Sequence, residues 1–298
     1  MLFSVLMGNC NNGKHLPEAL NSVIDQTYKN WEIVIVDDKS SDESIEIINE
    51  FIKRGVNIDL SVNRSNLGVG GTKRKCCELA TGEILGFLDP DDTIRKDALE
   101  LMIRSHQDKP AASIIYSTLY YCDSQLNIRR KAEWIKPLSE GKTNLHENVI
   151  SQFATFKKIN YSRTTGIDAT LLSAADKDLY YKLEETGKAC FLDEALYYYR
   201  ENENGVSQFK NKEGAISNHL KVLRSTIERR KVSGFNSLNR TDYRIRRSSL
   251  LMSKARLYTT KPSKLDLVVK YLFMSFLSWP LSKNKERIDL FYSALRNS

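Results

Sequence analysis

Short runs of Val, Ile and Leu alternate with amphipathic stretches at the start of the chain. Residues 2–7 and 32–36 are apolar without polar alternation, which is typical of strands that are buried on both faces. Between these runs, residues 16–24 carry Leu, Val and Ile at helical spacing, so that one apolar stripe would face a sheet. The pattern therefore predicts a strand, a helix and a second strand.

The same alternation continues through the next fifty residues. A helix is expected from Ser40, because Glu43 three residues later completes a capping box. Residues 58–62 alternate as a strand, a glycine-rich turn and a helix fill residues 68–82, and residues 84–88 form another apolar run. Strands that alternate with helices indicate an α/β protein with a parallel sheet, whose ligands bind beyond the carboxyl ends of the strands.

The periodicity is weaker after about residue 110. We expect a strand at residues 114–121, a polar and irregular substrate-facing stretch at 122–172, a helix at 176–185 and a last strand at 196–199. Beyond residue 207 the pattern is entirely helical.

Charge divides the chain at the same place. Residues 1–207 hold 25 Lys and Arg against 31 Asp and Glu, whereas residues 208–298 hold 20 against 6. The overall composition, 41% hydrophobic and 28% charged, is that of a globular protein and excludes disordered and fibrous classes. We therefore expect a domain over 1–207 and a basic helical region over 208–298 whose partner is anionic.

The start of the chain and its cysteines bear on its location. No basic segment precedes the apolar residues 2–7, so a secretory signal peptide is not expected. None of the five cysteines forms a C-x-x-C pair, which favours reduced thiols over a disulfide framework or a zinc site. We accordingly expect a cytoplasmic protein.

The basic region contains one strongly apolar segment. Twelve of the 17 residues from 265 to 281 are apolar, but Asp266 and Lys270 interrupt the segment, which is too short to cross a bilayer. A helix lying on the cytoplasmic face of a membrane, with lysines flanking it and Trp279 at headgroup depth, fits this pattern. The alternative is a helix that packs on the domain over 1–207 or in a dimer contact. Nucleic acid is not expected as a partner, because no recognition motif accompanies the charge.

Three carboxylates follow the strand at residues 84–88, in the sequence Asp89-Pro90-Asp91-Asp92. Carboxylates this close repel one another unless a cation neutralises them, and Mg²⁺ or Mn²⁺ prefers such oxygen ligands. The alternative is a solvated turn in which Asp91 or Asp92 caps a helix that begins at Thr93.

Several motifs occur together in one order along residues 1–207. They are Leu2 to Asn11, Gln26-Thr27-Tyr28, Glu32 to Asp42, Asn66-Leu67-Gly68, Ala80 to Glu83, Phe87 to Asp92 and Asp176 to Leu179. Jointly these motifs resemble those of family 2 glycosyltransferases.

The resemblance implies a GT-A fold, with a nucleotide-sugar-binding half at 1–110 and an acceptor half at 111–207. It implies that Asp38 hydrogen-bonds a uracil ring, that Lys73 contacts the nucleotide and that Asp176 is the catalytic base. The implied nucleotide-sugar contacts are Gly8, Asn9, Cys10, Asn11, Asp38, Gly68, Lys73, Asp89, Pro90 and Asp91, and the implied metal ligands are Asp91, Asp89 and Asp92.

The chemistry of sugar transfer requires groups of these types. A divalent cation, Mn²⁺ or Mg²⁺, stabilises the negative charge that develops on a leaving diphosphate, and a carboxylate accepts the proton of the acceptor hydroxyl. We therefore expect an inverting transferase that moves a sugar, most simply from a UDP-sugar, to a saccharide or lipid-linked acceptor in surface polysaccharide or glycolipid synthesis. The alternatives are a sugar-nucleotide nucleotidyltransferase and a non-catalytic nucleotide-sugar-binding protein; Cys10 and Ala175, which depart from the family pattern, keep the second open.

Two further groups of residues receive structural interpretations. The four histidines show no ligand spacing, and each is expected at the surface or in a helix cap. The run Tyr197 to Tyr199 is expected to pack in the sheet, with an aromatic platform for a sugar as the alternative.

Overall fold

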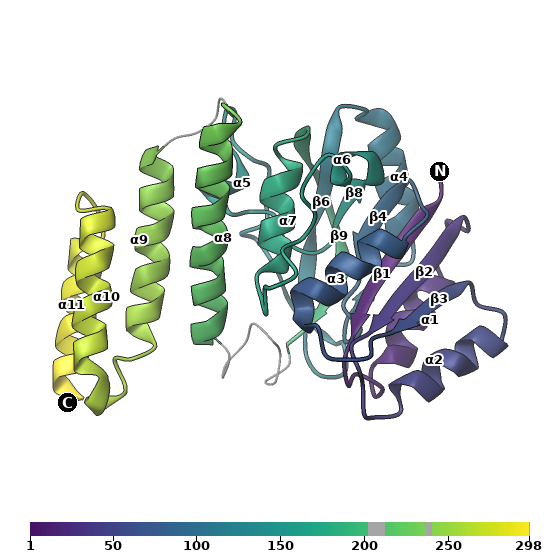
Figure 1. Cartoon of the computed structure of the whole chain (residues 1–298), viewed down its shortest axis with the longest axis horizontal. Helices are drawn as coiled ribbons and strands as arrows, with labels where there is room; N and C mark the ends of the chain where they lie inside the picture. The colour runs from purple at the N-terminus through teal and green to yellow at the C-terminus, as the bar shows by residue number, and fades with distance from the viewer. Residues whose placement is uncertain (202–211, 236–239, 298) are drawn as a thin grey trace. The chain divides into compact units, whose positions relative to one another are not determined.

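The computed structural model describes residues 1–201, 212–235 and 240–297 (Figure 1). Contacts within the chain divide it into two units, Met1–Glu203 and Asn204–Ser298. The boundary expected between residues 207 and 208 lies outside the described residues.

The first unit contains a mixed sheet and the helices that cover it. Its strands are β1 (Phe3–Asn9), β2 (Trp31–Asp37), β3 (Ile58–Val62), β4 (Ile84–Phe87), β5 (Thr93–Ile94), β6 (Ala112–Cys122), β7 (Ile128–Lys131), β8 (Ala154–Lys157) and β9 (Lys188–Arg200). Its helices are α1 (Leu16–Ile24), α2 (Ser44–Lys53), α3 (Gly68–Leu79), α4 (Ala98–Asp108), α5 (Asn144–Glu147), α6 (Lys158–Tyr161) and α7 (Ala175–Leu183).

The strand order is β3-β2-β1-β4-β8-β6-β9-β5, with β7 paired to β6. Strands β1 to β4 pair in parallel, as the sequence predicts, whereas β8 lies antiparallel between β4 and β6. Strand β9 then runs parallel to β6. The sheet is therefore mixed, and the antiparallel strand β8 joins the parallel strands β1 to β4 to the strands that follow.

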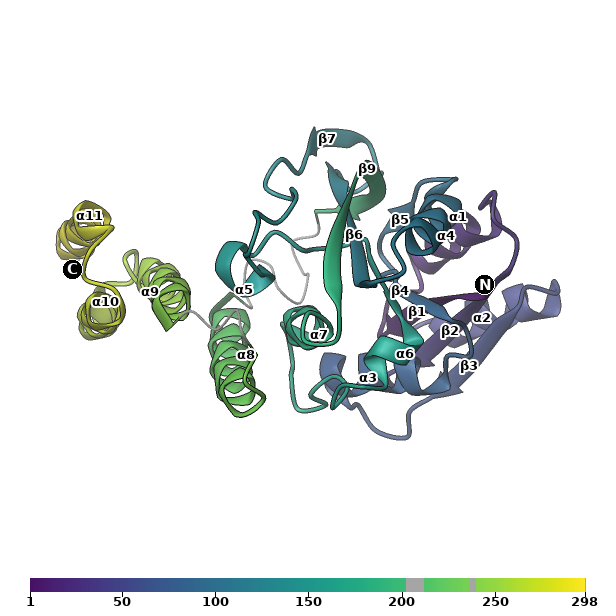
Figure 2. The ribbon, with the colours of Figure 1, turned by 90° about the horizontal axis from the view of Figure 1, so that it is seen from above.

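The apolar runs are buried for the expected reason. Every residue from Phe3 to Met7 on β1 is buried, because helices lie on both faces of the sheet. Helices α3 and α7 lie on one face, and α1 and α4 lie on the other (Figure 2). This arrangement leaves the carboxyl ends of β1, β2 and β4 at one edge, where the predicted carboxylates are.

Three details differ from the sequence prediction. The prediction of a capping box at Ser40 is wrong, because α2 begins at Ser44 and the hydroxyl of Ser40 donates a hydrogen bond to Asp37 instead. Residues 122–172 are more regular than expected, since they contain β7, β8, α5 and α6. The last strand is also longer than predicted, because β9 pairs with β6 along nearly its whole length.

The second unit is helical, as the sequence predicts. It contains α8 (Lys212–Val232), α9 (Arg240–Arg256), the 3-10 helix η2 (Pro262–Lys264), α10 (Leu265–Ser278) and α11 (Asn284–Arg296). Ala255, Val268, Leu272 and Ala294 form a small apolar core among α9, α10 and α11. In the part of the chain that the structure describes, no helix combines the length and the apolar character needed to cross a bilayer.

Candidate active site

The carboxyl ends of β1 and β2 are joined by a buried carboxylate. Asp37 is fully buried, and it accepts hydrogen bonds from the side chain of Asn9 at 2.7 Å and from the backbone and hydroxyl of Ser40 at 2.8 and 2.6 Å. The backbone of Asn11 donates in turn to the Ser40 hydroxyl. Asp37 therefore fixes the loop at residues 8–11, which contains the exposed Cys10.

Asp38 binds the loop that precedes α3. Its Oδ1 accepts from the Asn63 side chain at 2.9 Å and from the Leu67 backbone at 2.7 Å, and its Oδ2 accepts from the Gly68 backbone at 2.9 Å. Gly68 has a φ of +72°, a conformation that favours glycine. The structure thus gives Asp38, which is 4% exposed, a loop-positioning role, and the uracil contact stays a prediction.

Helix α3 approaches the loop at residues 168–171 closely. The backbone of Gly70 donates to the Leu171 carbonyl at 2.8 Å, and a Cβ at Gly70 would lie 2.4 Å from the Asp168 carbonyl oxygen. A side chain at this position would separate the two segments. The glycines at the start of α3 therefore serve close packing.

Lys73 joins two predicted site residues that are far apart in the sequence. Its ammonium lies 3.0 Å from Asp89 Oδ1 and 2.9 Å from Asp176 Oδ1. Burial favours the neutral amine, but the charges and hydrogen bonds of Asp176 and Asp89 raise the pKa of Lys73 well above its usual value. The lysine is therefore charged and holds the two carboxylates together.

The two carboxylates at residues 91 and 92 have different environments. Burial and the nearby charge of Asp89 raise the pKa of Asp91 to about 6. Asp92 is 2% exposed and accepts from the Tyr197 hydroxyl and the Arg200 backbone, both at 2.7 Å. Asp92 thus anchors the loop to β9. The charged form of Asp91, by contrast, is destabilised by its surroundings, and a bound cation would stabilise it.

Three residues to which the sequence analysis gave no role at this loop support it, and one of them, Tyr197, was expected only to pack in the sheet. Tyr197 donates to Asp92, Arg200 donates its Nε to the Asp91 carbonyl at 2.7 Å, and Gln152 donates to Asp89 Oδ2 at 3.0 Å. Each is separated from the loop by at least sixty residues, so no local motif could have identified these contacts.

Asp176 lies in the first turn of α7, and its side chain is 30% exposed. Ala174 before it adopts a left-handed conformation with a φ of +60°, which turns the chain into the helix. Asp178, two residues later, is buried and accepts from the Asp168 backbone and from Lys182 at 2.8 and 2.7 Å. Asp178 therefore supports the neighbouring loop and helix, and Asp176 is the carboxylate that solvent can reach.

Two buried polar atoms near the ends of β1 and α3 lack partners among the described residues. They are Asn9 Oδ1 and Thr72 Oγ1. Buried polar atoms are usually hydrogen-bonded, and an ordered water is one way in which such an atom gains a partner. These two atoms lie on the segments that the sequence assigns to the nucleotide sugar.

The donor atoms present are of the type that a hard divalent cation binds. Within the described residues, no three acidic, His or Cys side chains converge in a metal-binding cluster. Asp89 and Asp91 nevertheless offer carboxylate oxygens, and Mg²⁺ is commonly held by one or two carboxylates together with substrate phosphates. The residues therefore fit a cation that binds with a diphosphate, and the metal assignment stays a prediction.

The structure places the predicted residues in two neighbouring groups. Gly8, Asn9, Cys10, Asn11, Asp38 and Gly68 lie on the loops after β1 and β2 and at the start of α3, and Lys73, Asp89, Pro90, Asp91, Asp92 and Asp176 lie around the end of β4. Both groups lie beyond the carboxyl ends of the parallel strands.

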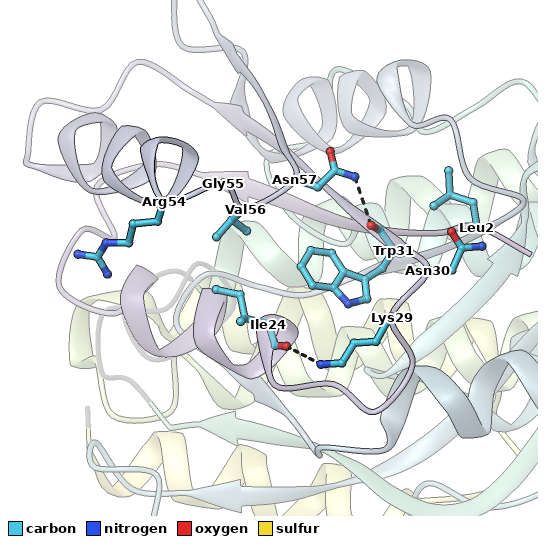
Figure 3. Close-up of a pocket in the computed structure, with 9 residues that line it drawn as sticks. All are labelled: Leu2, Ile24, Lys29, Asn30, Trp31, Arg54, Gly55, Val56 and Asn57. Carbon is cyan, nitrogen blue, oxygen red and sulfur yellow. Dashed lines mark hydrogen bonds between the residues drawn. The ribbon is translucent and has the colours of Figure 1, made fainter.

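A hollow at the opposite end of β2 contains none of the predicted residues. It is lined by Trp31 and by segments around Ile24, Lys29 and Asn57, and two backbone carbonyls there accept from the Lys29 ammonium and the Asn57 amide (Figure 3). Its lining side chains include no cluster of acidic residues, so it is a weaker candidate for the functional site than the residues at the carboxyl ends of the strands.

Solved structures of the same fold cover the whole chain. A fragment (residues 1–349) of TarS from S. aureus in complex with UDP-GlcNAc superimposes with a TM-score of 0.72 at 20% identity, over 100% of this chain and 88% of that one. A mannosyltransferase from Pyrobaculum calidifontis in complex with GDP-Man and Mn²⁺ gives a TM-score of 0.57 at 14% identity, over 99% of this chain and 86% of that one. The predicted GT-A-like α/β fold, followed by C-terminal helices, is thereby confirmed.

Curated relatives match much of the sequence. Chondroitin synthase from Escherichia coli is 24% identical over 229 residues, which are 76% of this chain and 33% of that protein. An uncharacterized glycosyltransferase of Methanocaldococcus jannaschii is 26% identical over 222 residues, which are 70% of this chain and 74% of that protein. The chain thus spans only a third of the length of the chondroitin synthase.

The family model for glycosyl transferase family 2 matches residues 4–169, more than half of the chain. This segment includes Asp38, Lys73 and the acidic loop at residues 89–92, and it ends before Asp176. The chain therefore belongs to glycosyl transferase family 2.

Proposed function

We propose that the protein transfers a sugar from a nucleotide sugar, with a UDP-sugar as the donor, to a saccharide or lipid-linked acceptor with inversion at the anomeric carbon. The observation that carries the proposal is the Lys73 bridge between Asp89 and Asp176. It brings an acidic loop suited to a metal diphosphate next to a reachable carboxylate suited to accept a proton.

The donor assignment is supported by the fold and by the exposed loop after β1. The TarS fragment of the same fold is a complex with UDP-GlcNAc. In this chain, Cys10 is exposed on that loop, where a base would lie.

Asp89 and Asp91 would hold the cation, with Mn²⁺ or Mg²⁺ as the candidates. When bound, the cation would stabilise the charge on the departing diphosphate. Asp92 would keep the loop in place through Tyr197 and Arg200 rather than serve as an equal ligand. Similar folds support the choice of metal, since the Pyrobaculum calidifontis mannosyltransferase complex contains Mn²⁺.

Asp176 would accept the proton of the attacking acceptor hydroxyl. A hydroxyl is a poor nucleophile until a base takes its proton, and Asp176 is the exposed carboxylate in the first turn of α7. Lys73 orients this carboxylate through its contact at 2.9 Å. A single base and one in-line displacement produce inversion without a covalent sugar intermediate.

The relatives support a role in polysaccharide or glycolipid synthesis. Their names include chondroitin synthase, hyaluronan synthase and an amylovoran biosynthesis glycosyltransferase. Because the chain covers a third or less of the two synthases, we propose only the class of process and leave the linkage to experiment.

The helical unit supports a location at the cytoplasmic face of an anionic membrane. On α10, Val269, Phe273, Phe276 and Leu277 are 44–60% exposed and recur at i, i+4, i+7 and i+8, which places them on one helical stripe. Exposed lysines flank this stripe, at residues 261, 264, 270, 283 and 285. An apolar stripe with flanking lysines is the arrangement of an interfacial helix.

Nucleotide binding with and without metal tests the catalytic proposal. UDP should raise the melting temperature only with Mn²⁺ or Mg²⁺, because Asp89 and Asp91 repel the diphosphate when no cation is bound. At a UDP concentration one hundred times Kd, the free energy of unfolding should increase by about 2.7 kcal/mol. Asp91→Asn should abolish the gain, and Asp59→Asn, at an exposed position on β3, should retain it. Equal stabilisation by UDP in a chelator would overturn the metal assignment.

A further inference from the structure

Trp134 lies exposed on the acceptor half of the first unit. It follows β7, and 42% of the residue is accessible to solvent. Its indole nitrogen donates a hydrogen bond to the Tyr121 hydroxyl at 3.1 Å. Single exposed apolar side chains are common on protein surfaces, but here a hydrogen bond fixes the ring while part of its aromatic surface stays accessible.

Tyr121, which accepts the hydrogen bond from Trp134, is itself held by two neighbours. The Tyr121 ring packs edge-on against Tyr199, with ring centres 5.7 Å apart and an angle of 81°. The guanidinium of Arg130 lies 4.0 Å from the centre of the Tyr121 ring and forms two hydrogen bonds to Glu201, at 2.6 and 3.1 Å. Tyr121 is therefore fixed from two sides, and the Trp134 ring is positioned before any ligand arrives.

The Trp134 ring is also within cation–π distance of the residue that follows the proposed base. The ammonium of Lys177 is 6.0 Å from the centre of the Trp134 ring and donates to the Ile150 carbonyl at 2.6 Å. Lys177 directly follows Asp176 in the first turn of α7, and neighbouring Cα atoms are about 3.8 Å apart. A short oligosaccharide could therefore contact Trp134 while one of its hydroxyls meets Asp176.

We propose that Trp134 is a binding platform for the acceptor saccharide. One face of a pyranose ring presents C–H groups, which pack favourably on the π-system of an indole, while the sugar hydroxyls remain free for polar contacts. Aromatic surfaces with a few fixed polar groups are typical of small-ligand sites. This inference rests on the proposed glycosyl transfer and adds the residue that binds the second substrate.

Binding of defined saccharides tests the platform. The probes are tetrasaccharides of chondroitin, hyaluronan and chitin, titrated into the full chain with UDP and Mn²⁺ present. At least one should bind the unmodified protein, and Trp134→Ala should weaken that binding by about tenfold or more. Trp134→Phe keeps an aromatic face and should lose less. Ile128→Ala, which removes another exposed apolar side chain on β7, should bind like the unmodified protein.

Donor binding separates this inference from the proposed function. The nucleotide part of the donor, tested as UDP with Mn²⁺, should bind the unmodified protein and Trp134→Ala with equal affinity, which also shows that the variant is folded. If the donor binds but Trp134→Ala holds the tetrasaccharides as tightly as the unmodified protein, or none of them binds, the platform is refuted and the donor site is unaffected. Failure of the donor itself to bind would instead contradict the proposed function.

Discussion

The ammonium of Lys73 lies 2.9 Å from the carboxylate of Asp176, although 103 residues separate the two in the sequence. The same ammonium lies 3.0 Å from Asp89 in the acidic loop. One buried lysine ammonium thus connects the acidic loop, which is the candidate metal site, with the candidate base. This bridge makes the two halves of the first unit depend on each other for the geometry of the site.

Replacing Lys73 by methionine should destabilise the protein in a metal-dependent way. Loss of one partner from a buried ion pair leaves uncompensated charge, and for these half-buried carboxylates we expect a loss of about 1 to 3 kcal/mol in the free energy of unfolding. Mn²⁺ should restore part of the loss, because it supplies positive charge at Asp89. Urea denaturation with and without Mn²⁺ measures both effects.

Lys182→Met is a matched control for this experiment. Lys182 also forms a buried ion pair, at 2.7 Å from Asp178, but that pair is separate from the acidic loop. Its loss should destabilise the protein with no recovery in Mn²⁺. Equal recovery in both variants would show that Mn²⁺ acts elsewhere.

Asp176→Asn should separate binding from turnover. The amide keeps the size of the side chain and an oxygen for Lys73, but it cannot accept a proton at neutral pH. Transfer should fall by roughly two to four orders of magnitude while UDP affinity stays nearly unchanged. Steady-state rates and a UDP titration provide the comparison, with Asp193→Asn on an exposed part of β9 as the control. A variant that retains full transfer activity would rule out Asp176 as the base.

His106 should make the protein less stable in mild acid. The sequence prediction of a surface or capping role is wrong for this residue, which is 2% exposed and contacts the Thr155 hydroxyl at 3.0 Å. Burial, with the charge of Lys157 nearby, lowers its pKa to about 3. The folded state therefore keeps the imidazole neutral, while the unfolded state takes up a proton below about pH 6.5, so stability falls as the pH decreases.

The His106 contribution can be isolated by substitution. When the pH is lowered from 7.5 to 5.5, the buried neutral His106 should reduce the free energy of unfolding by about 1 kcal/mol. The substitution His106→Gln should remove that part of the pH dependence. Urea denaturation of both proteins at the two pH values gives the difference. Identical pH dependence in the two would show that other groups determine acid stability.

The apolar stripe on α10 should determine membrane attachment. The double variant Phe273→Gln and Leu277→Gln removes two side chains that are 60% and 58% exposed, so the fold should persist. Sedimentation with anionic vesicles should be lost in this variant and should weaken for the unmodified protein in high salt, since each surface lysine contributes about 1 kcal/mol. Val232→Gln, at a 91% exposed position, should still sediment.

A packing or dimer role for the stripe makes the opposite prediction. The unmodified protein would then remain in the supernatant with vesicles at low salt, and the double variant would change the oligomeric state measured by light scattering. That pair of results would reject the membrane proposal.

The local sequence pattern was sufficient to predict the strands and helices of the first half of the sheet. Strands β1 and β2 are apolar runs buried on both faces, and the helices between strands carry regular apolar stripes, so their identity follows from periodicity. Strand β8 could not be found in this way. It has four residues and its partners are β4 and β6, about 40 to 70 residues away, so its existence depends on tertiary pairing.

The candidate site shows the same division. The acidic loop and Asp176 were identifiable from motifs, but the roles of their neighbours were not. Asp38 contacts backbone amides rather than open solvent, and Asp92 is paired with β9, because the chain folds back on each of them. Such long-range contacts have no signature in the residues nearby.

The attachment of Asp92 to β9 has a consequence for synthesis of the chain. Its two partners, Tyr197 and Arg200, are 105 and 108 residues downstream. Contacts of such long sequence separation form late, because the intervening loop must first be closed. A nascent chain on the ribosome would therefore complete β1 to β4 well before the acidic loop gains its support. Catalytic competence would then be the last property of the first unit to emerge, and would require residues beyond the matched family segment.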